Sequence, residues 1–141
     1  MTQPCPCGSG GSYAECCLPL HDNRVQAGTA EELRRSRYSA YALGRLGHVF
    51  RTWHPRTRPH EIEPSAGLTW VGLTIGRTEA GQPGDDEGVV EFEAAYQTAA
   101  GPGVLRERSW FLRRAGRWVY VNADVTEDLR LGLALMRAAA G

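Results

Sequence analysis

The sequence lacks a long apolar run, an excess of charge of either sign and any cysteine after residue 17. No stretch reaches the roughly twenty apolar residues that a membrane-spanning helix needs, and the N-terminus lacks the apolar run of a signal peptide. Sixteen basic and sixteen acidic side chains cancel, so no global field draws the chain to nucleic acid or to an anionic membrane. We therefore expect a cytoplasmic protein that binds any charged partner through a local patch.

Lysine is also absent, because all sixteen basic residues are arginine. This bias, beside the abundant alanine and glycine, reflects a genome's composition better than sixteen separate choices of guanidinium chemistry, so a single arginine carries little weight. Known catalytic motifs are missing too: there is no P-loop, no G-x-S-x-G and no zinc ligand set with an open coordination position. The 141 residues suffice for one domain with a short appendage.

What the sequence does contain is a cluster of four cysteines, arranged as C-x-C, eight further residues and C-C. A reducing compartment disfavours disulfides, whereas zinc needs four soft ligands around one point. The alternatives are free thiols, a redox pair or two disulfides, but no C-x-x-C motif is present and vicinal cysteines bond to each other only with strain. His21 is an alternative fourth ligand. The pattern predicts one structural zinc ion, bound by Cys5, Cys7, Cys16 and Cys17.

The chain changes character after this cluster, and we divide it into residues 1–23, 24–125 and 126–141. Thr29 followed by Glu32 is a capping-box signal and predicts that a helix begins there. Apolar residues then recur at helical intervals up to Trp53, with Gly44 and Gly47 marking a break between two helices. Pro55 is expected to end the second helix.

The periodicity changes to two in the second half of the chain, most clearly at 88–98, where Val90, Phe92, Ala94 and Tyr96 share one face. The segments 68–78, 104–114 and 117–123 show similar patterns and are joined by short turns, which predicts an antiparallel meander. Thr126 is expected to cap a C-terminal helix over 126–141. Helices followed by a meander indicate an α+β fold with helices packed across a curved sheet.

Two resemblances add to this interpretation. The cysteine cluster within residues 1–23 resembles the SEC-C zinc motif, CxCGSGxxY followed by CC or CH, which occurs at the C-terminus of the secretion motor SecA and in many other proteins. The segments RSRYSAYALG, TWHP, WVGLTI and ERSWFLRRAGRWVYVNAD resemble the YchJ-like family of bacterial proteins, and this likeness covers nearly the whole chain. It implies zinc at the four cysteines and a nuclear transport factor 2-like cone with an internal pocket over 24–125, but no particular reaction.

The mouth of such a cone could bring polar groups together, and His54 with Asp124 is the sharpest candidate for proton chemistry. The plainer alternative places His54 at a helix C-terminus against exposed carbonyls. Arg37 and Glu107 are expected to form a structural ion pair between helix and sheet, while His48 and His60 are expected on the surface. Further candidates are Arg108 and the aromatic side chains, most of which should simply pack in the core.

These observations favour a binding or adaptor module with a structural zinc over an enzyme, and they predict no catalytic or cofactor-binding residue other than the metal ligands. The expected partner is another protein. The alternative is a hydrolase or isomerase-type enzyme that holds a small apolar molecule in the cone and uses His54 and Asp124. A third hypothesis, nucleic-acid binding through the arginines of 33–37 or 51–58, is disfavoured by the neutral net charge. No membrane partner is expected, and the oligomeric state is left open.

Overall fold

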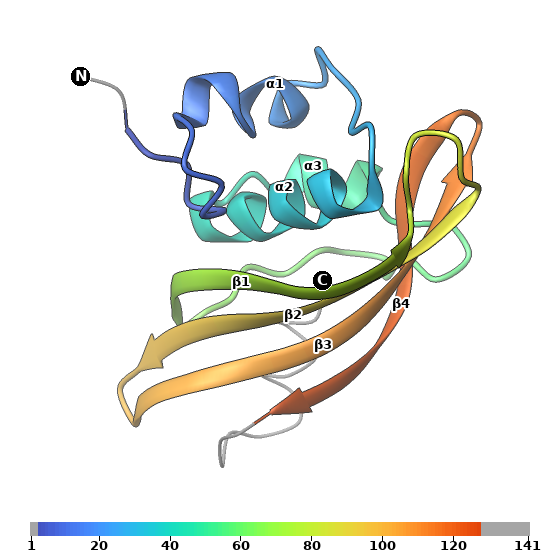
Figure 1. The fold of residues 1–141 in the computed structure, drawn as a ribbon. Helices are drawn as coiled ribbons and strands as arrows, with labels where there is room; N and C mark the ends of the chain where they lie inside the picture. The colour runs from blue at the N-terminus through green and yellow to red at the C-terminus, as the bar shows by residue number, and fades with distance from the viewer. Residues whose placement is uncertain (1–2, 128–141) are drawn as a thin grey trace.

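The structure, a computed structural model, describes residues 3–127 and consists of helices packed across one face of a curved antiparallel sheet (Figure 1). The strands pair in sequence order, which confirms the predicted meander and the α+β class. Each strand extends one to four residues past its predicted range at one end, because main-chain pairing continues into the turns. The strands are β1 (Thr69–Ala80), β2 (Glu87–Thr98), β3 (Gly101–Arg114) and β4 (Arg117–Glu127).

The inner face of the sheet is set by side-chain alternation in β2 and β3. Every second residue of β2 from Val90 to Tyr96 is buried, as predicted, whereas the alternate position Glu93 is exposed. In β3 the inward positions include Glu107 and Ser109, so two polar side chains enter an otherwise apolar layer. Aromatic and aliphatic side chains share the rest of the core; the buried aromatic residues in the described chain are Tyr38, Phe92, Tyr96, Phe111, Trp118 and Tyr120.

Two helices cover this face, α2 (Ala30–Leu43) and α3 (Leu46–Arg51) (Figure 1). The predicted start is confirmed, because Thr29 Oγ1 accepts a hydrogen bond of 3.1 Å from the Glu32 amide. The predicted break is confirmed at Gly44, which ends α2 in the left-handed region at φ 75°. Helix α3 ends before Thr52, earlier than the position expected from Pro55.

The N-terminal segment forms a compact knuckle, here defined as residues 3–23, that lies against α2 (Figure 1). It contains a 3-10 turn at Tyr13–Glu15 and a single-turn helix, α1 (Leu18–His21). Neither element was predicted, since a pattern of three or four residues is too short to show a periodicity. The buried residues of the knuckle are three cysteines and His21, and the cysteines form a satellite core separate from those of the sheet.

The two edges of the sheet differ from regular strand edges. In β1 the pairing with β2 shifts twice, between Trp70 and Gly72 and between Ile75 and Thr78. Along β4, the Tyr120 amide donates to the Thr52 carbonyl, and the His54 amide donates to the Tyr120 carbonyl, both at 2.7 Å. The segment after α3 therefore pairs with part of the β4 edge.

The predicted C-terminal helix falls almost entirely outside the described residues. Thr126, which was expected to cap it, instead lies in β4 and pairs with Arg106 of β3. Residues 128–141 are not described. None of the helices within 3–127 is long and apolar enough to cross a membrane.

Candidate metal centre

The four cysteines converge at one point of the knuckle. One sulfur from each of Cys5, Cys7, Cys16 and Cys17 lies within 4.8 Å of all the others. The Cys7 and Cys16 sulfurs are 3.6 Å apart, and those of Cys16 and Cys17 are 3.9 Å apart. A tetrahedral zinc ion with sulfur ligands at 2.3 Å would place neighbouring sulfurs about 3.8 Å apart. The thiols are not in disulfides, and this donor set could hold a soft metal ion.

A tight reversal of the chain makes this convergence possible. Gly8 and Gly10 adopt φ of 77° and 93°, a region that favours glycine, and turn the backbone between the two cysteine pairs. The Cys5 amide donates to the Gly11 carbonyl at 2.9 Å and closes the loop. The second pair then sits at the start of α1, with Cys17 at its N-cap.

The thiols cannot all ionise together without a compensating charge. Hydrogen bonding from the Cys17 thiol is the largest of the effects that lower the pKa of Cys7 to about 4. Burial is the main cause that raises the pKa of Cys5 to about 11, and hydrogen bonding to Cys7 followed by burial raises the pKa of Cys17. One thiolate forms readily and suppresses its neighbours, so a bound cation is needed to stabilise several thiolates in this space.

The knuckle is fixed to the rest of the molecule by polar and apolar contacts. Arg35 of α2 donates through Nη1 to the Cys7 carbonyl at 2.7 Å and through Nε to the Glu31 carboxylate at 3.0 Å. Leu73 of β1 packs against the buried cysteines. The thiol cluster therefore contacts both layers of the main domain and does not hang from a flexible linker.

His21 does not belong to the thiol cluster. Its side chain is buried, Nε2 lies 2.8 Å from the Ser36 carbonyl and Nδ1 lies 2.7 Å from the Tyr13 hydroxyl. Because a carbonyl only accepts, Nε2 carries the proton and the tyrosine donates to Nδ1. Burial is the main cause that lowers the pKa of His21. With both ring nitrogens engaged, His21 tethers the knuckle to α2.

His48 was expected on the surface, and this prediction was wrong. It is 4% exposed, and its ring centroid lies 5.0 Å from that of His21. Its Nε2 is 2.8 Å from the Ser36 hydroxyl, and burial is the main cause that lowers its pKa to about 2. This burial could not be predicted from the sequence, because α3 (Leu46–Arg51) is too short for its pattern to show which face points inward. His60, by contrast, is exposed as predicted.

The interior between α2 and the sheet holds a buried ion pair, but with a different arginine from the one predicted. Arg34 Nη1 lies 3.4 Å from Glu107 Oε2, and both side chains are almost fully buried. Burial raises the pKa of Glu107, partly opposed by the Arg34 charge. Arg37 lies nearby and donates to the Val49 carbonyl and to Thr52 Oγ1 at 2.9 and 2.8 Å. Arg34 Nε and Glu107 Oε1 have no hydrogen-bond partner among the described residues.

The candidate pair for proton chemistry is not assembled. His54 Nδ1 accepts from the Arg56 amide at 3.1 Å, beside the edge of β4. Asp124 is exposed and lines a groove with Arg77 and Arg108, which carry charge on the face of the sheet away from the helices. Within the described chain, no hydrogen bond or ion pair joins His54 to Asp124. His54 and Asp124 therefore do not form the acid-base pair on which the enzyme hypothesis was based.

Comparisons with known proteins agree with this architecture. Residues 29–123 match the family model described as YchJ, middle NTF2-like domain, and residues 1–19 match the SEC-C motif. A UPF0225 protein of Deinococcus radiodurans is 49% identical over 122 residues, covering 86% of this chain and 88% of its own. Another from Chromobacterium violaceum is 48% identical over 125 residues, covering 86% and 92%.

Two solved structures share the fold. The solution structure of a SEC-C motif containing protein from Rhodopseudomonas palustris has a TM-score of 0.77 at 30% identity and covers 85% of this chain and 96% of its own. The crystal structure of a SEC-C motif containing protein from Psychrobacter arcticus has a TM-score of 0.71 at 25% identity, covering 92% and 85%. On this evidence the chain belongs to the YchJ family of bacterial proteins, with an N-terminal SEC-C motif and an NTF2-like domain.

Proposed function

We propose that this protein is a binding or adaptor module whose knuckle holds one structural zinc ion through Cys5, Cys7, Cys16 and Cys17. The observation that carries the proposal is the convergence of four thiols within 4.8 Å in a segment that otherwise buries little apolar surface. Zinc bound in this way contributes on the order of 10 kcal/mol to folding such a segment. Four thiolates fill its tetrahedral shell, so the ion supplies structure and leaves no position for a reacting water.

The partner in this proposal is another protein, which contacts the outer side of the knuckle. The loop of residues 8–11 is exposed, as are Ala14 and Glu15, whereas the inner side is occupied by α2 and β1. This outer surface carries an acidic residue and no basic one, so it does not suit a nucleic acid. Because the knuckle is anchored at several points, it presents a fixed surface to a partner.

The zinc assignment is tested by metal analysis of the full chain purified under reducing conditions. We expect one zinc ion per chain, lost in Cys17→Ser because a hydroxyl replaces one of four thiolates. His21→Gln is the matched control and should keep its zinc, since both ring nitrogens bond to protein groups. Wild-type protein without stoichiometric metal, or zinc lost only from His21→Gln, would contradict the assignment.

The adaptor role is tested separately by cross-linking and capture with wild-type and Ala14→Arg baits. Position 14 is exposed in the knuckle, so the substitution should leave the zinc content unchanged while blocking the outer surface. We expect a captured protein to be lost from the Ala14→Arg bait and kept by an Arg56→Gln bait, which changes an exposed arginine elsewhere. Identical capture by all three baits would argue against this surface.

A further inference from the structure

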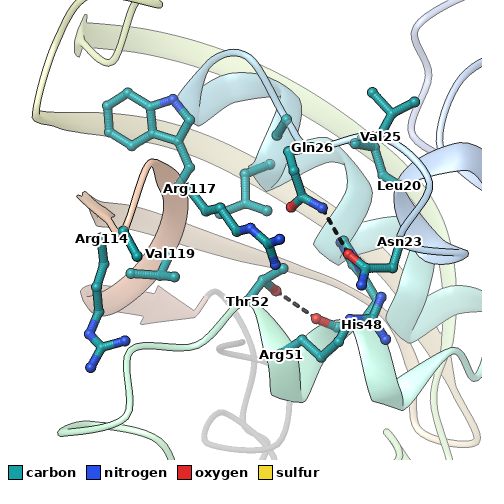
Figure 2. Close-up of a pocket in the computed structure, with 14 residues that line it drawn as sticks. Leu20, Asn23, Val25, Gln26, His48, Arg51, Thr52, Arg114, Arg117 and Val119 are labelled. Carbon is teal, nitrogen blue, oxygen red and sulfur yellow. Dashed lines mark hydrogen bonds between the residues drawn. The ribbon is translucent and has the colours of Figure 1, made fainter.

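A cavity of about 340 Å³ lies where three segments meet that are far apart in the sequence (Figure 2). The linker after α1 forms one wall, the C-terminal end of α3 forms the second, and the turn between β3 and β4 forms the third. Pockets for small molecules in proteins begin at about 300 Å³. The cavity lies outside the thiol cluster and away from the buried Arg34–Glu107 pair, and none of these residues lines it.

The lining of this cavity carries positive charge that is not balanced. It includes Arg51, Arg114 and Arg117, while no aspartate or glutamate occurs among the described residues that line it. Within the described chain Arg114 and Arg117 form no ion pair, and Arg51 donates only to the His21 carbonyl, at 3.0 Å. Carboxylates lie within 4.0 Å of many other arginines: Arg24, Arg34, Arg35, Arg45, Arg77, Arg106 and Arg108.

The turn between β3 and β4 brings two of these charges together. Ala115 and Gly116 adopt φ of 51° and 78°, the two-residue turn that suits a hairpin, so Arg114 and Arg117 are directly paired across the strands. Like charges in such a pair repel and destabilise the hairpin. In Figure 2 the Arg117 side chain extends from the turn towards Thr52, whereas the Arg114 side chain extends away from it. An anion in the cavity would meet the Arg117 charge, which forms no ion pair within the described chain.

Polar groups without charge complete one side of the cavity. Asn23 has φ of 59°, and its side-chain oxygen accepts from the Gln26 amide at 2.8 Å, which orients both side chains at the wall (Figure 2). His48 is buried at the base, and its Nδ1 has no hydrogen-bond partner among the described residues.

The rest of the lining is apolar, which sets the kind of anion that fits. Leu20 and Val25 provide apolar surface that a hydrated inorganic ion would not use, whereas Leu33 and Trp118 are almost fully buried. Arginine forks match phosphate oxygens in a bidentate way, and several guanidinium charges suit a dianion better than a monocarboxylate. We propose that this cavity binds a small organic phosphate, with its phosphate at Arg51 and Arg117 and its apolar part against Leu20 and Val25.

The test uses full-length, metal-loaded protein and isothermal titration calorimetry with phenyl phosphate, inorganic phosphate and benzoate. Phenyl phosphate should bind saturably and more tightly than the other two, because only it combines a dianion with an apolar ring. Arg117→Gln should weaken its binding by about tenfold, the loss of one charge-assisted contact. Arg56→Gln is the matched control, since it removes the same charge from an exposed position outside the cavity.

The outcomes separate the proposal from nonspecific attraction. No heat with phenyl phosphate, or equal weakening by Arg117→Gln and Arg56→Gln, would overturn it. If inorganic phosphate bound as tightly as phenyl phosphate, the apolar lining would contribute nothing to the affinity. If benzoate bound as tightly as phenyl phosphate, the cavity would show no preference for a dianion. If Arg117→Gln changed the circular dichroism spectrum, Arg114→Gln would take its place, with a smaller loss expected because that side chain extends away from Arg117 in Figure 2. The result does not depend on the zinc proposal, because the metal content is measured in the same samples.

Discussion

The knuckle and the four-stranded sheet are held together in different ways. The sheet buries alternate apolar side chains of β2 and β3 beneath α2, so its shape follows from removing apolar surface from water. The knuckle buries three cysteines and a histidine, and its backbone turns through two glycines with positive φ. One region is specified by a repeated pattern and the other by a few groups that must meet at one point.

This difference means that the two regions should fail independently. Apolar truncation in the sheet lowers the free energy of unfolding whether or not a metal is bound, whereas loss of a thiol affects the knuckle first. The contacts that join the knuckle to the rest of the molecule include the Arg35 bond to Cys7, the His21 bond to Ser36 and the packing of Leu73. Substitutions at Phe111 in the sheet, at His48 beside the knuckle and at Arg35, which bonds to Cys7, should therefore differ in their effects.

The largest expected effect is in the sheet. Phe111 is fully buried, so Phe111→Ala should lower the free energy of unfolding by about 3 to 5 kcal/mol through lost burial and a cavity. The neighbouring Trp110 faces the other way and is 37% exposed, so Trp110→Ala should cost less than half as much. Urea denaturation, with and without a chelator, measures both. A Phe111→Ala loss that disappears after chelation would mean that the sheet depends on the knuckle.

An intermediate effect is expected at His48 of α3, which lies against His21 of the knuckle. This residue makes the free energy of unfolding depend on pH. Its pKa is lowered from 6.5 to about 2, chiefly by burial, so between these values only the unfolded chain takes up the proton. The stabilisation is therefore complete above the unfolded pKa and is lost as pH falls. At pH 5.5 the loss from this group is about 1.4 kcal/mol relative to neutral pH.

The measurement is urea denaturation between pH 7.5 and 5.5 in excess zinc. His21 shifts in the same direction, so the informative comparison is between wild type and His48→Gln, which should lose less stability on acidification. His60→Gln, at an exposed position, should keep the wild-type slope. Equal slopes in wild type and His48→Gln would show that the imidazole is protonated in the folded protein.

The smallest effect is expected from the contact between the regions. Arg35→Gln removes the hydrogen bond to the Cys7 carbonyl and the ion pair with Glu31, worth about 1 kcal/mol in total for a partly exposed group. Competition with a chelator should show zinc bound about fivefold less tightly. Arg24→Gln, which breaks an exposed pair with Asp22, should leave the affinity unchanged. Equal affinities for wild type and Arg35→Gln would mean that the knuckle holds metal without support from α2.

The parts of the fold that the sequence predicted are those with local rules. The alternation from Val90 to Tyr96 identified a half-buried strand, and the Thr29 cap located the start of α2 to the residue. The cysteine spacing identified the candidate metal centre, because ligands in one short segment can meet without the rest of the fold. In each case the signal and the structure lie within about a dozen residues.

What was missed depends on how distant segments are rotated and packed. Arg34 and Arg37 lie almost one turn apart on α2, so the ion pair with Glu107 could be assigned only once the rotation of the helix over β3 was known. The burial of His48 depends on the position of the knuckle above α3. The cavity that we propose binds an organic phosphate is lined by residues from separate segments of the chain, and no pattern within any one segment indicates it.

The irregular edges of the sheet have a consequence for solubility at high concentration. A straight terminal strand offers a row of free amides and carbonyls on which another chain can assemble. Here the two register shifts in β1 interrupt that row, while residues 52–54 occupy part of the row on β4. The sheet therefore ends at four strands in the described chain, and neither edge provides an unbroken template for aggregation.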